Sequence, residues 1–390
     1  MTPHRFRRPI VLGALSGVAV AVVIAAFLPS PGRTDAPYGV VLSECDGALR
    51  RLVIQYEPGA KAISLPVFRE FLPQLPADVT VHVVCPDDAA WRELADAVGP
   101  TDCTLTPRIV GHAMTTWSRD RWVCLRDTAG WAVLLHGAAE AGAELWPARE
   151  GDQRIAADLA ASLPRVLEHR TGLLFDGGDV MADSRNALIV GRVLARNVGK
   201  TVESPEDFRL RMGRLLGRPV TILDAPDHHA AMFMMSAGDN VMLVGDVRLA
   251  RAMLTGHARL AREMPVEQLL PGGVDDSDTM QQSLDGLAEQ CRQLGYEVVR
   301  MPLLPSRDGR VFVTYLNAIL DARDGRRIVY MPVYRHADPL NAAATAVWQS
   351  LGYEVRPIDC TSAYRHFGCL HCLVNVLERS ITVGRFSPPG

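Results

Sequence analysis

Thiol, imidazole and carboxylate side chains occur in four short motifs that lie far apart in this chain of 390 residues. The motifs are Trp117-Ser118-Arg119-Asp120, Asp176-Gly177-Gly178-Asp179, His228-His229 and Gly368-Cys369-Leu370-His371-Cys372. Taken singly, each is more typical of structure than of chemistry, because an Asp after Arg usually forms a surface ion pair and Asp-Gly-Gly is usually a turn. Together, a thiolate, a histidine that exchanges protons and a carboxylate that binds a cation would suffice for nucleophilic catalysis. Such chemistry requires a fold that brings the four motifs together.

The order and context of these motifs resemble the agmatine deiminase and bacterial peptidyl-arginine deiminase branch of the guanidino-group-modifying superfamily. The matching patterns are W-x-R-D at Trp117–Asp120, acidic-Gly-Gly at Asp176–Gly178, Tyr-x-Asn at Tyr315–Asn317 and Gly-x-x-x-Cys at Gly368–Cys372. The resemblance covers most of the chain after the N-terminal linker. It implies the α/β fold of that family, a five-bladed pseudo-symmetric propeller called a pentein. It also implies hydrolysis of a guanidino group, in agmatine or an arginine derivative, to a ureido group and ammonia.

The resemblance gives each matching residue a role. Cys372 would attack the guanidinium carbon to form a covalent amidino-thioether, and Asp120 would bind the guanidinium nitrogens with charge-assisted hydrogen bonds. His229 would protonate the departing ammonia and then deprotonate the attacking water. The residues expected to bind substrate are Trp117, Arg119, Asp176, Asp179 and Asn317. Neither a metal nor an organic cofactor is implied, and the expected partner is a small-molecule or peptidyl guanidine.

Two histidines compete for the acid–base role. Family sequences place this histidine three residues before the first Met/Phe-rich strand positions, and Met232 lies three residues after His229. This spacing favours His229 over His228.

The chain departs from the family pattern at two positions. A second substrate-binding aspartate normally follows the histidine by two residues, where this chain has Ala231, or Ala230 if His228 is used. Cys369 occupies a position where the family prefers glycine. An enzyme with altered substrate choice is one interpretation, since dimethylarginine hydrolases resemble this hairpin and also lack that carboxylate, and Asp176 or Asp179 could supply the second anion. An amidinotransferase and a non-catalytic guanidinium-binding domain are the alternatives.

The C-terminal motif allows two further interpretations. Its candidate zinc ligands are Cys360, His366, Cys369, His371 and Cys372, but they lack the paired spacing of a structural zinc site. Cys369 and Cys372 also form a C-x-x-C pair, which could be a redox couple or a regulatory disulfide in an exported protein. No thioredoxin-like pattern precedes that pair.

Short strands alternate with helices along the chain. Leu52–Tyr56 and Val79–Cys85 are predicted strands, and Asp87 caps a helix that ends near Gly99. Ser204 caps a second helix, with Pro205 at its first position, that should end near Gly217.

Repetition supports a propeller. The sequence Leu-Gly-Tyr-Glu-Val occurs at Leu294–Val298 and again at Leu351–Val355, in each case between a helix and a strand. Returning hairpin strands are predicted at Asn186–Gly191, Asn240–Gly245 and Arg327–Pro332. Such units would fit about five times after Pro37 and would surround a central funnel. One unit carries an insertion, 264–278, expected to be a solvated loop, with a lid or a weak calcium site as alternatives.

The N-terminus differs in composition from the rest of the chain. His4, Arg5, Arg7 and Arg8 precede an uncharged run from Ile10 to Leu28, which is about long enough to cross a bilayer. We expect residues 1–36 to be an uncleaved membrane anchor or a signal peptide with a linker, and 37–390 to be the deiminase-like domain. The domain should then face the periplasm or the cell exterior. A buried core helix is the structural alternative.

The overall composition is that of an ordinary globular protein. Hydrophobic residues make up 48% and charged residues 22% of the chain, so disorder is excluded. The net charge is -3 and no basic run follows the N-terminus, so a nucleic-acid partner is not expected.

Overall fold

The computed structural model describes residues 38–138, 147–255, 269–270, 272–275 and 277–380. The expected N-terminal helix lies outside these residues, and so do 264–268, 271 and 276 of the 264–278 insertion. Within the described ranges no helix is long and apolar enough to cross a membrane.

Five separate β-sheets contain all the strands of the described residues. The strands of each sheet are given in the order in which neighbours are hydrogen-bonded. The first sheet consists of β18 (Val374–Arg379), β2 (Leu49–Gln55), β3 (Thr80–Cys85) and β4 (Thr104–Ile109). The second consists of β1 (Val40–Val41), β5 (Trp122–Arg126), β6 (Ala132–His136) and β7 (Val166–Arg170). The third consists of β8 (Val180–Ala182), β9 (Ala187–Val190) and β10 (Val220–Leu223).

The last two sheets carry the repeated Leu-Gly-Tyr-Glu-Val segments. The fourth consists of β11 (Met234–Ser236), β12 (Val241–Asp246), β13 (Glu297–Pro305) and β14 (Phe312–Thr314). The fifth consists of β15 (Ile319–Arg323), β16 (Arg326–Val333) and β17 (Tyr353–Asp359).

Every sheet contains the same three-strand unit, an antiparallel pair followed by a parallel strand. A helix connects the two parallel strands, as a parallel crossover requires. In chain order these helices are α2 (Lys61–Phe71), α5 (Ile155–Ser162), α7 (Pro205–Leu216), α11 (Asp278–Gln293) and α12 (Asp338–Ser350). The remaining helices are α3 (Asp88–Val98), α4 (Pro147–Asp152), α6 (Val193–Asn197), α8 (Val247–Thr255) and α13 (Leu370–Leu373). The 3-10 turns are η1 (Pro58–Ala60), η2 (Leu72–Gln74), η3 (Gly177–Asp179), η4 (Ala230–Met232) and η5 (Tyr364–His366).

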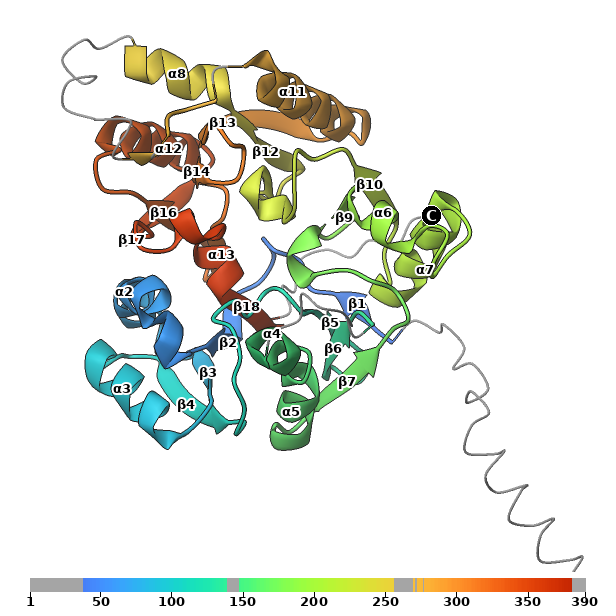
Figure 1. The fold of residues 1–390 in the computed structure, drawn as a ribbon, viewed down its shortest axis with the longest axis vertical. Coiled ribbons are helices and arrows are strands. Elements are labelled where there is room, and N and C mark those ends of the chain that lie inside the picture. The colour runs from blue at the N-terminus through green and yellow to red at the C-terminus, as the bar shows by residue number, and fades with distance from the viewer. Residues whose placement is uncertain (1–37, 139–146, 256–268, 271, 276, 381–390) are drawn as a thin grey trace, which may run out of the picture. The chain divides into compact units, whose positions relative to one another are not determined.

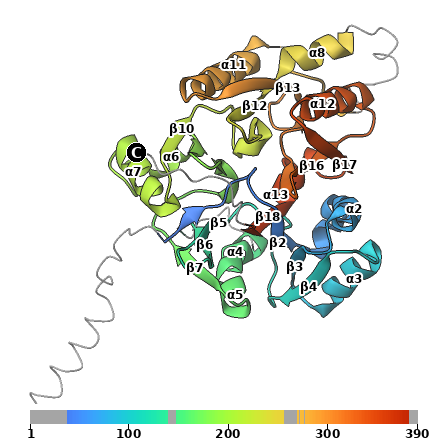
Figure 2. The same ribbon diagram turned by 180° about the vertical axis from the view of Figure 1, so that it is seen from behind.

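The five units follow one another around a common centre, with the connecting helices on the outside (Figure 1). The opposite view shows the same order, with α13 and β18 again near the middle (Figure 2). The expectation of five α/β units is therefore confirmed, and the described part of the chain has a mixed α/β pentein architecture.

The local sequence signals were also correct. The Asp87 side chain accepts from the Ala90 N–H at 2.8 Å, and α3 ends at Gly99, whose φ is 73°. The three predicted hairpin returns are β9, β12 and β16, each paired antiparallel with the preceding strand. Both repeated Leu-Gly-Tyr-Glu-Val segments end a helix at a glycine with positive φ, Gly295 or Gly352, which side chains disfavour.

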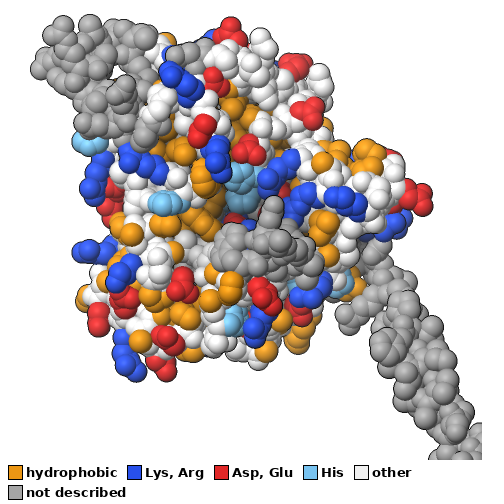
Figure 3. Space-filling model, in the orientation of Figure 1, with side chains coloured by type: hydrophobic (Ala, Val, Ile, Leu, Met, Phe, Trp, Pro, Cys, Tyr) orange, Lys and Arg blue, Asp and Glu red, His pale blue; other side chains and the backbone are white. Residues whose placement is uncertain are grey.

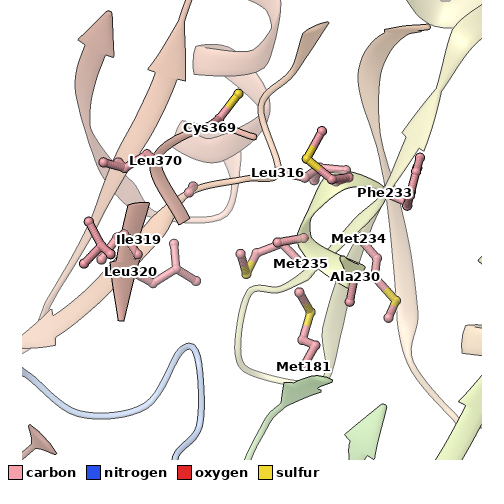
Figure 4. Packing of buried hydrophobic residues seen from close by; sticks show 14 of the residues in the cluster. Met181, Ala230, Phe233, Met234, Met235, Leu316, Ile319, Leu320, Cys369 and Leu370 are labelled. Carbon is pink, nitrogen blue, oxygen red and sulfur yellow. The ribbon is translucent and has the colours of Figure 1, made fainter. Parts of the chain in front are cut away.

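The centre of the ring is filled by flexible apolar side chains from several units. Figure 4 shows Met181 of β8 and Met234 and Met235 of β11 near Leu316, and Ile319 and Leu320 beside Leu370 of α13. Unbranched methionine suits this place because it adapts to the irregular space between sheets of different orientation. The four polar motifs lie in the loops and short helices between the strands.

The C-terminal strand closes the ring. β18 pairs antiparallel with β2, placing Val374 opposite Ile54 and Asn375 opposite Val53. The first sheet is thus built from both ends of the described chain, and the short helix α13 with Cys372 stands directly before the closing strand.

Candidate active site

A pocket of about 250 Å³ opens where the motif turns meet. Its walls include Trp117, Asp120, Asp176, His228, His229 and Cys372. In Figure 3, histidine side chains lie at the middle of one face of the molecule, with Lys and Arg side chains next to them. The volume is slightly below the ~300–1,000 Å³ typical of pockets for drug-sized ligands, which fits a small substrate or a single inserted side chain.

The central contact joins Cys372 to His229. The Cys372 sulfur lies 3.5 Å from Nδ1 of His229, and Nε2 of the same ring lies 3.8 Å from Oδ1 of Asp120, within ion-pair range. All three residues are buried. The ring of His229 therefore stands between a thiol and a carboxylate.

The electrostatics of this contact favour a proton on His229. Burial opposes the charged ring, but the hydrogen bond and negative charge of Cys372, with Asp120 and Asp179, raise the pKa of His229 to about 10. The described geometry thus places a protonated ring 3.5 Å from the Cys372 sulfur.

His228 occupies a different position. It lines the pocket, but its Nδ1 lies 3.0 Å from Asp227, and its ring meets that of His229 edge to face at 4.8 Å. The structure therefore brings His229, and not His228, to Cys372.

Asn317 is hydrogen-bonded to the turn that carries Cys372. Its side-chain oxygen accepts from the His371 N–H at 2.9 Å, and its Nδ2 donates to the Cys372 sulfur at 3.3 Å. The same nitrogen lies 3.3 Å from the Met232 sulfur. Asn317 is fully buried and does not line the pocket, so it is placed to orient the thiol instead of the substrate.

The turn Trp117–Asp120 is fastened to the cysteine turn by its backbone. The Arg119 N–H donates to the Cys372 carbonyl at 3.2 Å, and the Ser118 hydroxyl donates to the Leu373 carbonyl at 2.7 Å. Gly368 makes a further close approach possible, because a Cβ there would lie 2.6 Å from the Trp117 ring. These contacts explain the glycine of the Gly-x-x-x-Cys pattern.

The Asp-Gly-Gly-Asp turn links the other two motifs. Gly177 donates to the Asp120 carbonyl at 2.7 Å, and a Cβ on Gly177 would lie 2.4 Å from the Arg119 carbonyl oxygen. A Cβ on Gly178 would lie 2.6 Å from the His229 ring. The first glycine therefore fits under the Asp120 turn, and the second leaves room for the imidazole.

Asp179 supports His229 without lining the pocket. Its Oδ1 accepts from the His229 N–H at 3.3 Å, and His229 has a left-handed φ of 57°, which is unusual for a residue with a side chain. Backbone strain of this kind persists only where surrounding contacts impose it, and it is frequent at functional sites.

Arg119 does not take the substrate-binding position that the sequence suggested. Its Nη2 lies 2.5 Å from Oε1 of Glu44, which is also 3.2 Å through Oε2 from the His371 ring. Burial would raise the pKa of Glu44, but Arg119 and His371 lower it to about 2. Arg119 thus belongs to a buried ion-pair network beneath the pocket, outside its lining.

Asp176 lines the pocket, as expected of a substrate-binding residue, but is surrounded by arginines. Arg196 contacts it at 3.0 Å, Arg121 at 3.4 Å and Arg192 at 3.5 Å. Burial would raise the pKa of Asp176, yet Arg196 and Arg121 hold it below its usual value.

Two arginines of the pocket wall were missed by the sequence reasoning. Arg149 of α4 contacts Oδ2 of Asp120 at 2.5 Å and Asp152 at 3.3 Å, and Arg192 precedes α6. Arg149 lies outside any motif, so no local signal identified it. Arg192 directly follows the predicted strand ending at Gly191, and strand ends are common positions for functional residues, so this signal could have been used.

Ala231 is buried with 1% exposure among apolar neighbours and is not part of the pocket wall. The position where the family has its second substrate-binding aspartate therefore does not face the pocket. Cys369 is also fully buried, and its sulfur lies 3.3 Å from the Tyr334 hydroxyl. All eight cysteines are free thiols, so the C-x-x-C pair is not a disulfide in this structure. Among the described residues no cluster of His, Cys, Asp and Glu forms a metal site.

We predict that His229 titrates far above an ordinary histidine. Histidine-selective NMR, with His229→Gln to assign the signal, should give a pKa near 10, because Cys372 and the two aspartates stabilise its proton. The proton should be retained at neutral pH and lost as the pH rises through that value. Cys372→Ala should lower this pKa, since the largest stabilising partner is removed.

His371 is the internal control for this titration. Burial lowers its pKa, although Glu44 opposes the shift, so its ring should be neutral at pH 7. A His229 signal that titrates near 6.5 in both proteins would contradict the ion pair.

No protein-family model matches the sequence, and no curated protein is similar to it. Solved structures do match. The agmatine deiminase of C. jejuni shares 14% identity, covers 87% of this chain and 96% of its own, and superposes with a TM-score of 0.64. The same enzyme was also solved as a cysteine-to-serine variant with substrate bound, again at a TM-score of 0.64.

Two further structures agree with that match. A provisionally assigned peptidyl-arginine deiminase shares 14% identity over 87% of this chain and 99% of its own, with a TM-score of 0.65. The agmatine deiminase of Enterococcus faecalis shares 10% identity over 88% of this chain and 96% of its own, with a TM-score of 0.59. The resemblance inferred from the motifs is thus confirmed at the level of structure: the chain has the pentein fold of the agmatine deiminases.

Proposed function

We propose that this protein is a cysteine hydrolase that converts a guanidino group into a ureido group and ammonia. The observation that carries the proposal is the Cys372–His229 contact at 3.5 Å, with Asp120 on the other side of the ring, all within one pocket. The pentein fold shared with agmatine deiminases supports it.

The first half-reaction would form a carbon–sulfur bond. The Cys372 thiolate attacks the guanidinium carbon, and His229 gives its proton to one terminal nitrogen, which leaves as ammonia when its bond to carbon breaks. The product is an amidino-thioether on Cys372. A proton held on His229 at neutral pH suits this step.

The second half-reaction would restore the thiol. His229, now neutral, takes a proton from water, and the resulting hydroxide attacks the thioether carbon. The carbon–sulfur bond then breaks and the hydroxyl proton is released, which gives the ureido product, while the ammonia from the first step takes up a proton from solvent. Cys372 leaves as the thiolate beside the imidazolium. Guanidinium and water thus give a ureido group and ammonium, with no net change in the enzyme.

Asp120 would hold the guanidinium during both steps. Its Oδ1 faces His229, whereas its Oδ2 is already bound by Arg149. A substrate guanidinium therefore has to share or displace the Arg149 contact. Asp152, which is buried and is not part of the pocket wall, also contacts Arg149. Burial raises the pKa of Asp152 to about 6, although Arg149 and Thr115 oppose this.

Replacing the nucleophile should abolish turnover. Cys372→Ala should lower kcat/KM at least about 10³-fold without unfolding the protein, because no other atom bonds to substrate. His229→Ala should permit at most slow thioether formation, and His228→Ala should do much less harm. Ureido-product formation from a panel of agmatine, arginine, a peptidyl arginine and a methylated guanidine is the measurement.

Four outcomes would change this proposal. Full activity of Cys372→Ala would refute it, and a larger loss in His228→Ala than in His229→Ala would reassign the proton transfer. Amidinated amine instead of ureido product, when an acceptor amine is added, would indicate an amidinotransferase. Failure of a haloacetamidine to label Cys372 would indicate a non-catalytic domain.

Gly178→Ala should impair catalysis while preserving the fold. The new methyl group would meet the His229 ring at 2.6 Å, so the ring has to move away from Cys372. Since a displacement of about 1 Å can cost about 10²-fold in rate, kcat/KM should fall by about that factor. Gly172→Ala is the matched control, because a Cβ there meets no atom within 4 Å. Equal activity of the two variants would show that the ring position does not matter.

Arg149→Gln should lower KM for a cationic guanidine by up to about tenfold, because Oδ2 of Asp120 becomes available to the substrate. Arg149→Lys, which keeps the charge, is the control and should leave KM closer to the parent value. Steady-state kinetics would decide: a rise in KM or a loss of kcat in Arg149→Gln would show that Arg149 instead orients Asp120 for catalysis.

A further inference from the structure

Arg192 is the loosely held cation of the pocket wall. It follows Gly191 at the end of the β9 hairpin and forms the N-terminal boundary of α6. Its side chain is 39% exposed, compared with 18% for Arg149, the other arginine of the wall. Its exposure leaves the guanidinium accessible to a ligand inside the pocket.

The contacts of Arg192 with protein carboxylates are long. Nε lies 3.4 Å from Asp179 and Nη2 lies 3.5 Å from Asp176, both beyond the 2.7–2.9 Å expected for strong charge-assisted hydrogen bonds. Among the described residues, Nη1 has no hydrogen-bond partner. The guanidinium of Arg192 can therefore donate hydrogen bonds beyond those it makes to the described residues.

Asp176 does not depend on Arg192 for charge compensation. Arg196 approaches it at 3.0 Å and Arg121 at 3.4 Å, and these are the two arginines that contribute most to lowering its pKa. Arg192 could turn toward a bound anion without leaving Asp176 buried and unpaired.

The acidic neighbours of Arg192 differ from the carboxylate beside His229. Asp120 lies beside His229, and it shares Arg149 with Asp152. Arg192 also lines the wall and makes no ion pair with Asp120 among the described residues. Its acidic neighbours are Asp176, Asp179 and Asp227, and each of them also contacts Arg196, Arg121 or His228.

We propose, on the basis of the proposed function, that the natural substrate is a guanidino acid and that Arg192 binds its carboxylate. The guanidinium would bind at Asp120, and the carboxylate at the opposite end would accept two parallel hydrogen bonds from the Arg192 fork. A terminal ammonium, as in agmatine, would face a cation at that end and would be disfavoured. Arg192 is thus a specificity-determining residue.

Three guanidines of closely matched length test this assignment in the full-length protein. They are 5-guanidinopentanoate, agmatine and butylguanidine, in which the fourth carbon of the chain carries a carboxylate, an ammonium or only hydrogen. The parent should turn over the acid with a kcat/KM about tenfold or more above that of agmatine, with butylguanidine between them. In Arg192→Gln the ratio of acid to butylguanidine should fall about tenfold, and Arg192→Lys should restore part of it.

Arg209→Gln is the matched control. It removes the same charge from an exposed position of α7, where Arg209 pairs with Glu206 and does not line the pocket. Its effect should therefore be similar for the three substrates, leaving their ratios unchanged. An equal fall in the acid ratio in both variants would show that distant charge, and not contact with Arg192, selects the substrate.

The possible failures are distinguishable. If the parent forms ureido product from agmatine at least as well as from the acid, or if Arg192→Gln leaves the ratio unchanged, the role of Arg192 is refuted while the hydrolase remains. If the parent forms no ureido product from any of the three, and the broader panel also fails, the proposed function is refuted and this inference with it.

Discussion

The pairing of β18 with β2 is the constraint on which the site depends. Residues near the two ends of the folded domain form one sheet, and α13 is carried to the centre of the ring directly before that pairing begins. The Cys372 turn then receives hydrogen bonds from the Arg119 N–H and from Nδ2 of Asn317, and its His371 N–H donates to the Asn317 side-chain oxygen. Without ring closure, the thiol would have neither a carboxylate nor an imidazole beside it.

Burial and steric exclusion together determine the chemistry of the site. His229 retains a proton in a buried position because the sulfur and two carboxylates offset the desolvation of the charged ring. Asp179 holds the position of His229 by accepting a hydrogen bond from its backbone N–H, and Gly178 has no side chain and so leaves space for the ring. Strain at a φ of 57° is thus maintained by neighbours that belong to a different unit of the ring.

Local patterns in the sequence were sufficient to predict the repeating units. Caps at Asp87 and Ser204, positive-φ glycines after helices, and three hairpin returns all depend on residues close in sequence. The motifs also identified Cys372, His229 and Asp120, which the structure brings together. The pairing partners of charged residues could not be predicted, because they depend on three-dimensional contacts. Arg119 was expected at the substrate but reaches Glu44, and Arg149 was not expected at Asp120 at all.

The buried contact between Glu44 and His371 bears on the order in which parts of the domain fold. Glu44 and His371 touch at 3.2 Å although 327 positions separate them along the chain. Contacts of such long range form late, since closing so large a loop costs entropy before any contact compensates. A nascent or clipped chain without β18 would therefore contain the turns that carry Asp120 and His229, but Cys372 would not be positioned beside them. The contact between Cys372 and His229 therefore forms only once the ring has closed.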